Sequence, residues 1–233
     1  YNVDLENSEI IEDLVYYYDE PFADSSAIPT YYVSKLAKKE VTVVLSGDGG
    51  DELFAGYNWH DWMLKYAAFN RIPQNVRRLL SDMSNSIPLH FKGKHFMGVL
   101  KLEEFDTFFE RTSLFSNSEL KLLLKNECSG NFYQQYKSNY YNSGDSLLKR
   151  LTRTDFSYYL PDDVLTKVDR ASMANSLEAR VPLLDHKICE FAFSLCDSLK
   201  IKDIQRKYLL KQVARKWLPP DFNFTRKQGF SIP

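Results

Sequence analysis

The sequence predicts an α/β protein that is predominantly helical. An apolar, mostly β-branched run at residues 41–45 has the character of a buried parallel strand, and it ends in a glycine-rich turn. Much of the remaining chain has apolar residues at the three- and four-residue spacing of amphipathic helices. A strand, a glycine turn and a helix in succession indicate a ligand site, because open α/β folds bind ligands at the carboxyl ends of their strands.

The composition narrows the class of protein further. The 233 residues are 44% hydrophobic, which is enough to bury the core of one large domain, or of one domain with a helical lobe. The 30 basic and 31 acidic residues nearly cancel and form no long basic run, so we expect no nucleic-acid partner. No apolar run approaches the ~20 residues that span a bilayer, and no signal peptide is visible. We therefore expect a cytoplasmic protein with no membrane partner.

Two helices are expected before the strand, of which the first is amphipathic. The first spans residues 8–18 and ends before Pro21, because a proline disfavours the α conformation in the residue that precedes it. A short loop follows, in which Ser25 or Ser26 can cap the second helix, at about residues 28–39. This order of helix and strand fits one step of a parallel sheet whose earlier strands lie outside the sequence.

The turn after the strand reads SGDGGDE. Its glycines permit a backbone with positive φ and the close approach of a ligand. Its three carboxylates, on Asp48, Asp51 and Glu52, would repel a bare phosphate, but they suit Mg²⁺ placed between protein and polyphosphate. The alternative is a solvated acidic turn whose last two acids favour the start of a helix. The spacing matches neither a Walker A loop nor an EF-hand.

Residues 59–159 show helical periodicity, many charges and no convincing strand. We expect a helix that starts at Pro73, and a capping box of Ser116 and Glu119 ahead of a leucine-rich helix. The aromatic residues over 132–141 could stack on bases, but their helical spacing favours the core. The region is expected to be a helical insertion packed against the sheet.

A further helix over residues 146–159 is expected to end at Leu160-Pro161. Asp162 and Asp163 are then placed to cap the next helix, at 164–176. That helix carries three charged residues whose simplest interpretation is an exposed, paired face: Lys167, Asp169 and Arg170.

The segment after this helix has an arginine between two acids. Arg180, between Glu178 and Asp185, can form a buried fork-type ion pair that fixes a loop, so we interpret these residues as structural. Asp185 should also cap the helix that follows it. The last helix is expected over about residues 207–217, because Pro219 prevents it from continuing.

Four stretches, in order along nearly the whole chain, resemble the asparagine synthetase family. The glycine turn with its strand resembles a signature of the family's synthetase domain, and the other three resemble segments that precede and follow it. The stretches are VVLSGDGGDELFAGY (43–57), DEPFADSSAIPTYYVSKLA (19–37), LPDDVLTKVDRASMANSLEARVPLLDH (160–186) and TRKQGFSIP (225–233).

The resemblance implies a fold that the sequence covers only in part. The family's synthetase domain is a parallel-sheet domain of the adenine nucleotide alpha hydrolase-like (ATP pyrophosphatase) type with a large helical portion. Residues 1–58 would be its remaining βα part and 59–233 its mostly helical part, with the whole of 1–233 a partial synthetase domain. The family's SGGxDS loop and its amino-terminal glutaminase domain do not occur in the sequence. We therefore expect a carboxy-terminal fragment that is inactive alone and exposes an apolar face where the first strands should pack, from which dimerisation, as a homodimer, or aggregation would follow.

The resemblance also implies roles for particular residues. ATP would be contacted by residues of the glycine turn, and Asp51 would hold Mg²⁺. The residues implied in binding ATP are Ser46, Gly47, Asp48 and Gly49. The residues implied in catalysis are Asp48, Asp163, Asp169 and Lys227.

The implied reaction is ATP-dependent formation of an amide. A substrate carboxylate, that of aspartate or a similar acid, would be adenylated and then attacked by ammonia. The ammonia would come from glutamine through the glutaminase domain of the full-length chain. Relatives that close β-lactams, cyclise peptides or amidate other carboxylates remain alternatives, as does a non-catalytic interaction module.

Overall fold

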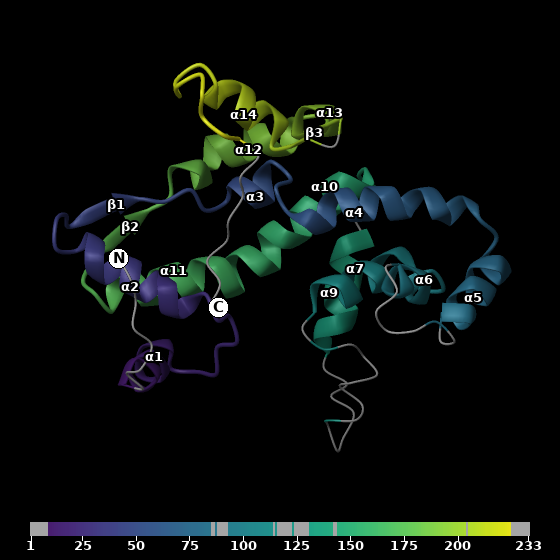
Figure 1. The fold of residues 1–233 in the computed structure, drawn as a ribbon, viewed down its shortest axis with the longest axis horizontal. Helices are drawn as coiled ribbons and strands as arrows, with labels where there is room; N and C mark the ends of the chain where they lie inside the picture. The colour runs from purple at the N-terminus through teal and green to yellow at the C-terminus, as the bar shows by residue number, and fades with distance from the viewer. Residues whose placement is uncertain are drawn as a thin grey trace. The chain divides into compact units, whose positions relative to one another are not determined.

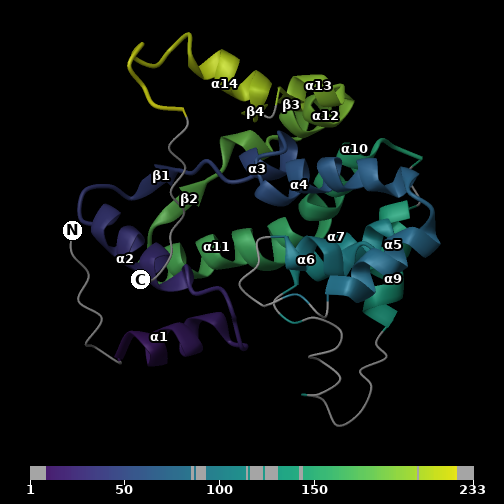
Figure 2. The same ribbon diagram turned by 45° about the vertical axis from the view of Figure 1, so that its right-hand side comes forward.

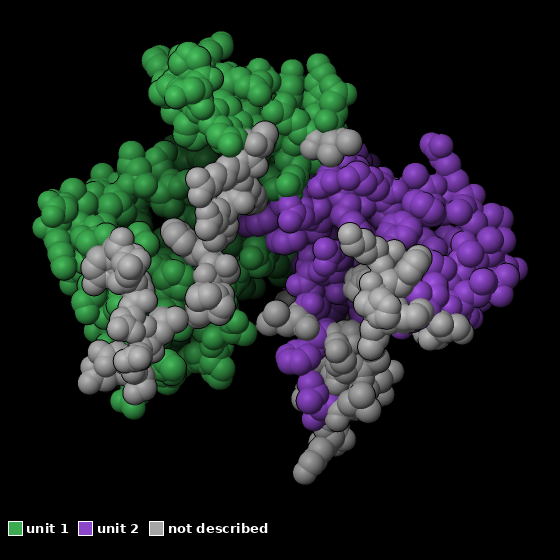
Figure 3. Space-filling view, viewed as in Figure 1, with its two compact units in different colours: residues 1–56, 152–233 green, residues 57–151 purple. Residues whose placement is uncertain are grey.

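The computed structural model describes residues 9–84, 87, 93–113, 115, 123, 131–141, 144–203 and 205–224 (Figures 1 and 2). It is a mostly helical α/β structure with a small parallel sheet. The chain divides into two compact units, of which unit 1 comprises residues 1–56 and 152–233 and unit 2 comprises residues 57–151 (Figure 3). None of the helices in the described ranges is both long enough and apolar enough to cross a membrane.

Unit 1 contains both pairs of strands and the helices around them. Its first elements are α1 (Glu9–Tyr18), α2 (Ala27–Ala37), β1 (Val43–Leu45) and α3 (Gly50–Leu53). Its later elements are a π-helix (Asp155–Leu165), α11 (Thr166–Met173), β2 (Glu178–Arg180), a 3-10 helix (Pro182–Leu184), α12 (His186–Ser194), α13 (Asp197–Lys200), β3 (Ile201–Lys202), β4 (Gln205–Arg206) and α14 (Tyr208–Ala214).

The predicted parallel strand is confirmed as β1, but its predicted burial is wrong. β1 pairs in parallel with β2, so that Val43 lies opposite Glu178 and Leu45 opposite Arg180. Leu45 is nevertheless 74% exposed. Among the described residues the sheet has only these two strands, so β1 is an edge strand whose side chains remain open to solvent. The sequence analysis missed β2, because its three residues include two charged ones and carry little strand propensity.

The helix predicted to end at Pro161 continues through it. α10 (Leu147–Thr154), the π-helix and α11 follow one another without a break, and the boundary between the two units falls within α10. Proline lacks an N–H, and the wider π turn accommodates the lost helical bond. Asp162 and Asp163 therefore lie within a helix, and their predicted capping role is wrong.

Two apolar clusters hold the elements of unit 1 together. Leu53 and Phe54 at the end of α3 pack with α12 and with Phe156 of the π-helix. Ile10 of α1, Tyr31 of α2 and Ala171 of α11 form a second cluster. The first cluster anchors the short helix that follows the glycine turn, because Leu53 is fully buried.

The described part of unit 2 consists of helices and turns, as expected. Its elements are α4 (Asn58–Ala67), a 3-10 helix (Ala68–Arg71), α5 (Gln74–Met83), α6 (Lys94–Val99), α7 (Glu104–Thr112), α9 (Asn131–Tyr141) and the first half of α10. The helix expected after Pro73 is confirmed as α5. Tyr136 and Tyr140 are buried against Phe105, which confirms that these aromatic residues belong to the core. The capping box of Ser116 and Glu119 lies outside the described residues.

Candidate functional site

The glycine turn leaves the sheet directly at the carboxyl end of β1. The N–H of Ser46 donates to the carbonyl of Arg180 at 2.8 Å, which extends the parallel pairing by one step. The Ser46 hydroxyl donates to Asp48 Oδ2 at 2.5 Å. Ser46 therefore uses its N–H for the sheet and its hydroxyl proton for Asp48, which leaves its carbonyl and hydroxyl oxygens as acceptors.

Gly47 and Gly49 differ in whether the fold itself requires a glycine at that position. A Cβ added to Gly47 would meet no atom within 4 Å, so this backbone is open to a ligand. Gly49 has a φ of +80°, and a Cβ there would lie 2.2 Å from Leu184 Cδ2. Gly49 is thus required by the fold of the turn, while Gly47 leaves space that the fold does not use.

We expect Gly49→Ala to lower the free energy of unfolding by about 2–4 kcal/mol. The left-handed backbone strains any residue with a Cβ, and the added methyl group overlaps the Leu184 side chain. Gly47→Ala is the matched control, and denaturant titration should find it within about 1 kcal/mol of the wild type. Equal losses in the two variants would contradict this interpretation of the turn.

Asp51 lies on α3 and forms an ion pair with a lysine that the sequence analysis did not single out. Lys207 Nζ lies 3.0 Å from Asp51 Oδ2, and each side chain is about one quarter exposed. Lys207 precedes α14, with a φ of 54°, and its N–H donates to the carbonyl of Phe54. No local pattern in the sequence could have indicated this pair, since its partners are brought together only by the packing of unit 1.

The turn fits magnesium bound together with a polyphosphate. Among the described residues, no three or more His, Cys, Asp or Glu side chains gather in a way that could hold a metal ion. Mg²⁺ commonly binds one or two carboxylates and completes its shell with water and phosphate oxygens. Asp51 offers one such carboxylate, four residues after the open backbone at Gly47.

A second polar group of unit 1 lies on the loop before α2 and on the helix that runs through the π segment. Lys167 Nζ lies 2.5 Å from Asp24 Oδ2, and Asp24 also accepts hydrogen bonds from the N–H and the hydroxyl of Ser26, both at 2.8 Å. Ser26 occupies the N-cap position of α2, but its hydroxyl donates to Asp24 and makes no capping hydrogen bond, so the predicted capping by Ser26 is wrong. Asp163 is hydrogen-bonded to Tyr159 and interacts with the charges of Asp24 and Lys167.

The two carboxyl groups of this cluster have opposite pKa shifts. Burial would raise the pKa of Asp24, but the hydrogen bonds from Lys167 and Ser26 outweigh it and hold the pKa below its usual value. Burial, followed by the charge of Asp24, raises the pKa of Asp163 despite its contacts with Lys167 and Tyr159. Burial and the two aspartates also raise the pKa of the Tyr18 phenol to about 12. Folding therefore favours the ionised form of the Asp24 carboxyl group and the protonated form of the Asp163 carboxyl group.

We expect Asp24→Asn to lower the free energy of unfolding at neutral pH and Asp163→Asn not to lower it. The lowered pKa of Asp24 gives stability above about pH 4 that is lost as the pH falls through that pKa, so its replacement should cost about 1–3 kcal/mol at pH 7. The raised pKa of Asp163 gives stability below about pH 4 that is lost as the pH rises, so its replacement should leave stability equal or higher at pH 7. Denaturant unfolding at pH 3 and pH 7 measures both, and a shared loss at pH 7 would contradict the assignment.

The structure connects some of the predicted site residues and separates others. α3, which carries Asp51, packs against the π-helix, which carries Asp163. Asp169, in contrast, is exposed and lines a groove of about 490 Å³ together with Arg170 and Glu178. The Glu178–Arg180 pair forms at 2.6 Å but is more than half exposed, so its predicted burial is wrong. Asp185, in contrast, caps α12 as predicted, by accepting from the N–H of Lys187.

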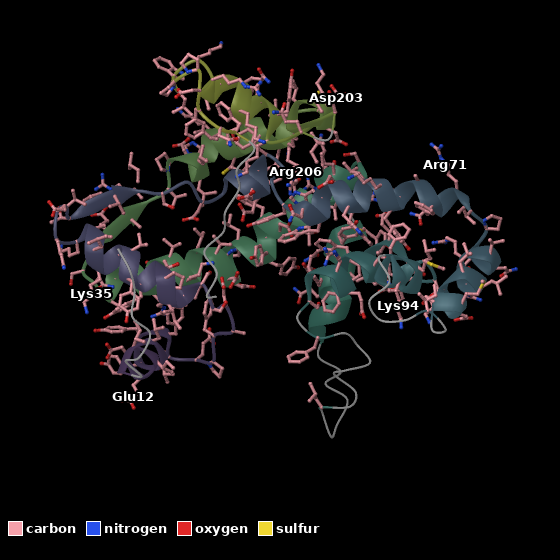
Figure 4. The ribbon with its side chains drawn as sticks, in the orientation of Figure 1. Glu12, Lys35, Arg71, Lys94, Asp203 and Arg206 are labelled. Carbon is pink, nitrogen blue, oxygen red and sulfur yellow. The ribbon has the colours of Figure 1, made fainter. Side chains whose placement is uncertain are left out.

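A larger groove, of about 850 Å³, lies between α1 and the start of α2. Its lining is mostly apolar and includes Tyr18, Phe22 and Asp24. Charged residues on the outer faces of the same helices, such as Glu12 and Lys35, point away into solvent (Figure 4). Asp24 therefore lines this apolar groove and also forms the ion pair with Lys167. Lys227, the remaining predicted catalytic residue, lies outside the described residues.

Comparison with known proteins identifies the chain at the level of a family. A family model described as asparagine synthase matches residues 2–233. A curated protein named asparagine synthetase [glutamine-hydrolyzing] 1, from Bacillus subtilis, is 36% identical over 94% of this chain and 35% of its own length. A putative asparagine synthetase from Mycobacterium bovis is 33% identical over 96% of this chain and 34% of its own. A putative asparagine synthetase from Methanocaldococcus jannaschii is 34% identical over 71% of this chain and 32% of its own length.

The chain spans about a third of the length of the curated relatives it matches. The comparison with solved structures gave no significant match.

Proposed function

This chain belongs to the asparagine synthase family, and from that premise we propose that it forms part of a ligase that makes asparagine from aspartate at the expense of ATP. ATP would be cleaved to AMP and pyrophosphate, and the ammonia would come from glutamine through a glutaminase domain of the same full-length protein. Because the chain spans about a third of its relatives, the activity belongs to that larger protein.

The observation that carries the proposal is the turn at the end of β1. It joins an open backbone at Gly47 to a carboxylate at Asp51, next to a strand that is paired in parallel. Ligands of open α/β sheets bind at such strand ends. We infer that this turn belongs to a sheet of the ATP pyrophosphatase type, whose further strands lie in the rest of the protein.

In this proposal, each part of the turn has a distinct task. The backbone around Gly47 and Gly49 would lie against the nucleotide, and Asp51 would hold Mg²⁺. When bound, the cation would neutralise charge on the triphosphate. Asp48, fixed by the Ser46 hydroxyl, would orient the second substrate or accept a proton as ammonia forms the amide.

The remaining proposed residues would act on the reacting groups from other elements. Asp163, with its raised pKa, and Asp169 lie on the helix of residues 155–173 and would contribute to the same reaction. Lys227 would stabilise charge that develops at the α-phosphoryl group, a role that suits the compact charge of lysine. The substrate carboxylate attacks that phosphorus, pyrophosphate leaves, and ammonia then displaces AMP from the acyl-adenylate.

The test uses the full-length natural protein that contains this chain. It is incubated with ATP, Mg²⁺, aspartate and either glutamine or ammonia. The expected result is asparagine in amounts that match AMP and pyrophosphate, and exchange of labelled pyrophosphate into ATP that depends on aspartate. Exchange supported by another carboxylate, or formation of a cyclic product, would replace aspartate with that substrate. The absence of exchange with any carboxylate would favour a non-catalytic module.

A further inference from the structure

We propose that Lys207 is a positioning residue that serves as a built-in counter-ion for Asp51 and competes with Mg²⁺ for its carboxylate. The inference rests on the proposed function, since it concerns the same carboxylate. It adds Lys207, a residue late in the sequence of unit 1. None of the four stretches that resemble the family includes this lysine.

The geometry fixes Lys207 beside Asp51. Its Nζ lies 3.0 Å from Asp51 Oδ2, and both side chains are about three quarters buried. The backbone of Lys207 is held as well, because its N–H donates to the carbonyl of Phe54, three residues after Asp51. The pair therefore differs from a solvated surface pair, whose long side chains are free to move apart.

Gly56 provides the space in which the pair forms. A Cβ at Gly56 would lie 1.8 Å from Asp51 Oδ1 and 2.2 Å from Lys207 Cε. A residue with any side chain at this position would displace both partners. The glycine, the aspartate and the lysine thus form one packed unit, which is independent evidence that the contact is a built feature of the fold.

The same oxygen cannot serve both cations equally well. With Lys207 in place, Asp51 is already neutralised, so a divalent cation must displace the ammonium or bind beside a positive charge. A partly exposed pair of this kind is worth up to about 1 kcal/mol, which corresponds to about a fivefold change in binding. We infer that Lys207 holds Asp51 in place between binding events and raises the Mg²⁺ concentration that ATP binding requires.

The test measures binding and needs no turnover. ATP binding to the full-length protein is followed by calorimetry at stepped Mg²⁺ concentrations, with no carboxylate substrate present. We expect Lys207→Met to lower the Mg²⁺ concentration for half-maximal ATP binding about threefold, and Lys207→Arg, which keeps the charge, to stay near the wild type. Lys202→Met is the matched control, because Lys202 lies over the Tyr208 ring and its replacement removes the same charge from a neighbouring position.

A double variant tests whether the effect of Lys207 on Mg²⁺-dependent ATP binding requires Asp51. In an Asp51→Asn background, adding Lys207→Met should change nothing further, because the carboxylate for which the two cations compete is absent. A midpoint that moves with Asp51→Asn but not with Lys207→Met, or that rises in Lys207→Met, would overturn the inference and leave the proposed function standing. ATP binding that is independent of Mg²⁺ in the wild type would overturn both.

Discussion

Asp51→Asn in the full-length protein is expected to raise the Mg²⁺ requirement of aspartate-dependent pyrophosphate exchange and to lower its rate about a hundredfold. Asparagine is nearly isosteric with aspartate but lacks the charge that a hard cation needs. The loss of the partly exposed pair with Lys207 should reduce stability by no more than about 1 kcal/mol, so the variant should still fold. Exchange is measured as a function of Mg²⁺ concentration, next to thermal unfolding.

Asp61→Asn is a suitable control for this experiment. Asp61 of unit 2 forms an ion pair with Lys65 on α4, and its replacement removes an equal charge from a residue outside the glycine turn. Its Mg²⁺ dependence should match the wild type. If the Asp51 variant shows the same Mg²⁺ dependence as this control, Asp51 is not a metal ligand and serves as a partner of Lys207 alone.

Lys227→Ala is expected to abolish most exchange, with a loss of about a hundredfold or more, and to melt near the wild-type temperature. A positioned ammonium that meets charge developing at the α-phosphoryl group acts on the transition state, and removal of one such stabiliser typically has an effect of this size. The sequence around Lys227, between Arg226 and Gln228, shows no pattern in which folding requires a lysine. Pyrophosphate exchange and a melting curve, measured on the same preparation, separate the two effects.

Two further variants sharpen the Lys227 experiment. Lys227→Arg should rescue exchange poorly, because a planar guanidinium does not reproduce a compact ammonium. Arg226→Ala removes the neighbouring positive charge and should leave exchange within a few-fold of the wild type. Near-normal exchange in Lys227→Ala would remove this lysine from the mechanism.

Features that depend on a short stretch of chain could be predicted from the sequence. The helix at α2, the strand before the glycine turn and the cap of α12 by Asp185 follow from local periodicity, β-branching and a single side-chain hydrogen bond. The family resemblance added the choice of Ser46, Gly47, Asp48, Gly49 and Asp51 as candidates. Their roles remain predictions, for which the structure supplies contacts.

Features that depend on packing between distant segments could not be predicted. Pro161 is a local signal for a helix end, yet the helix widens into a π segment, against which α3 packs, and continues into α11. Lys207 acquires its partner only when α14 reaches the end of α3. Asp24, in the loop that was expected to cap α2, becomes a partly buried acceptor because Lys167 arrives from the other half of unit 1.

The discontinuity of unit 1 has a consequence for the order of events during synthesis. Asp24 and Lys167 are 143 residues apart in the chain, and β1 must likewise wait for β2. Residues 57–151, which cluster among themselves, leave the ribosome in between. Because local contacts close short loops at little entropic cost, we expect this inserted unit to become compact while the first half of unit 1 still lacks its partner. The glycine turn would then acquire its final shape late in translation, and a pause before residue 178 would expose β1 for longest.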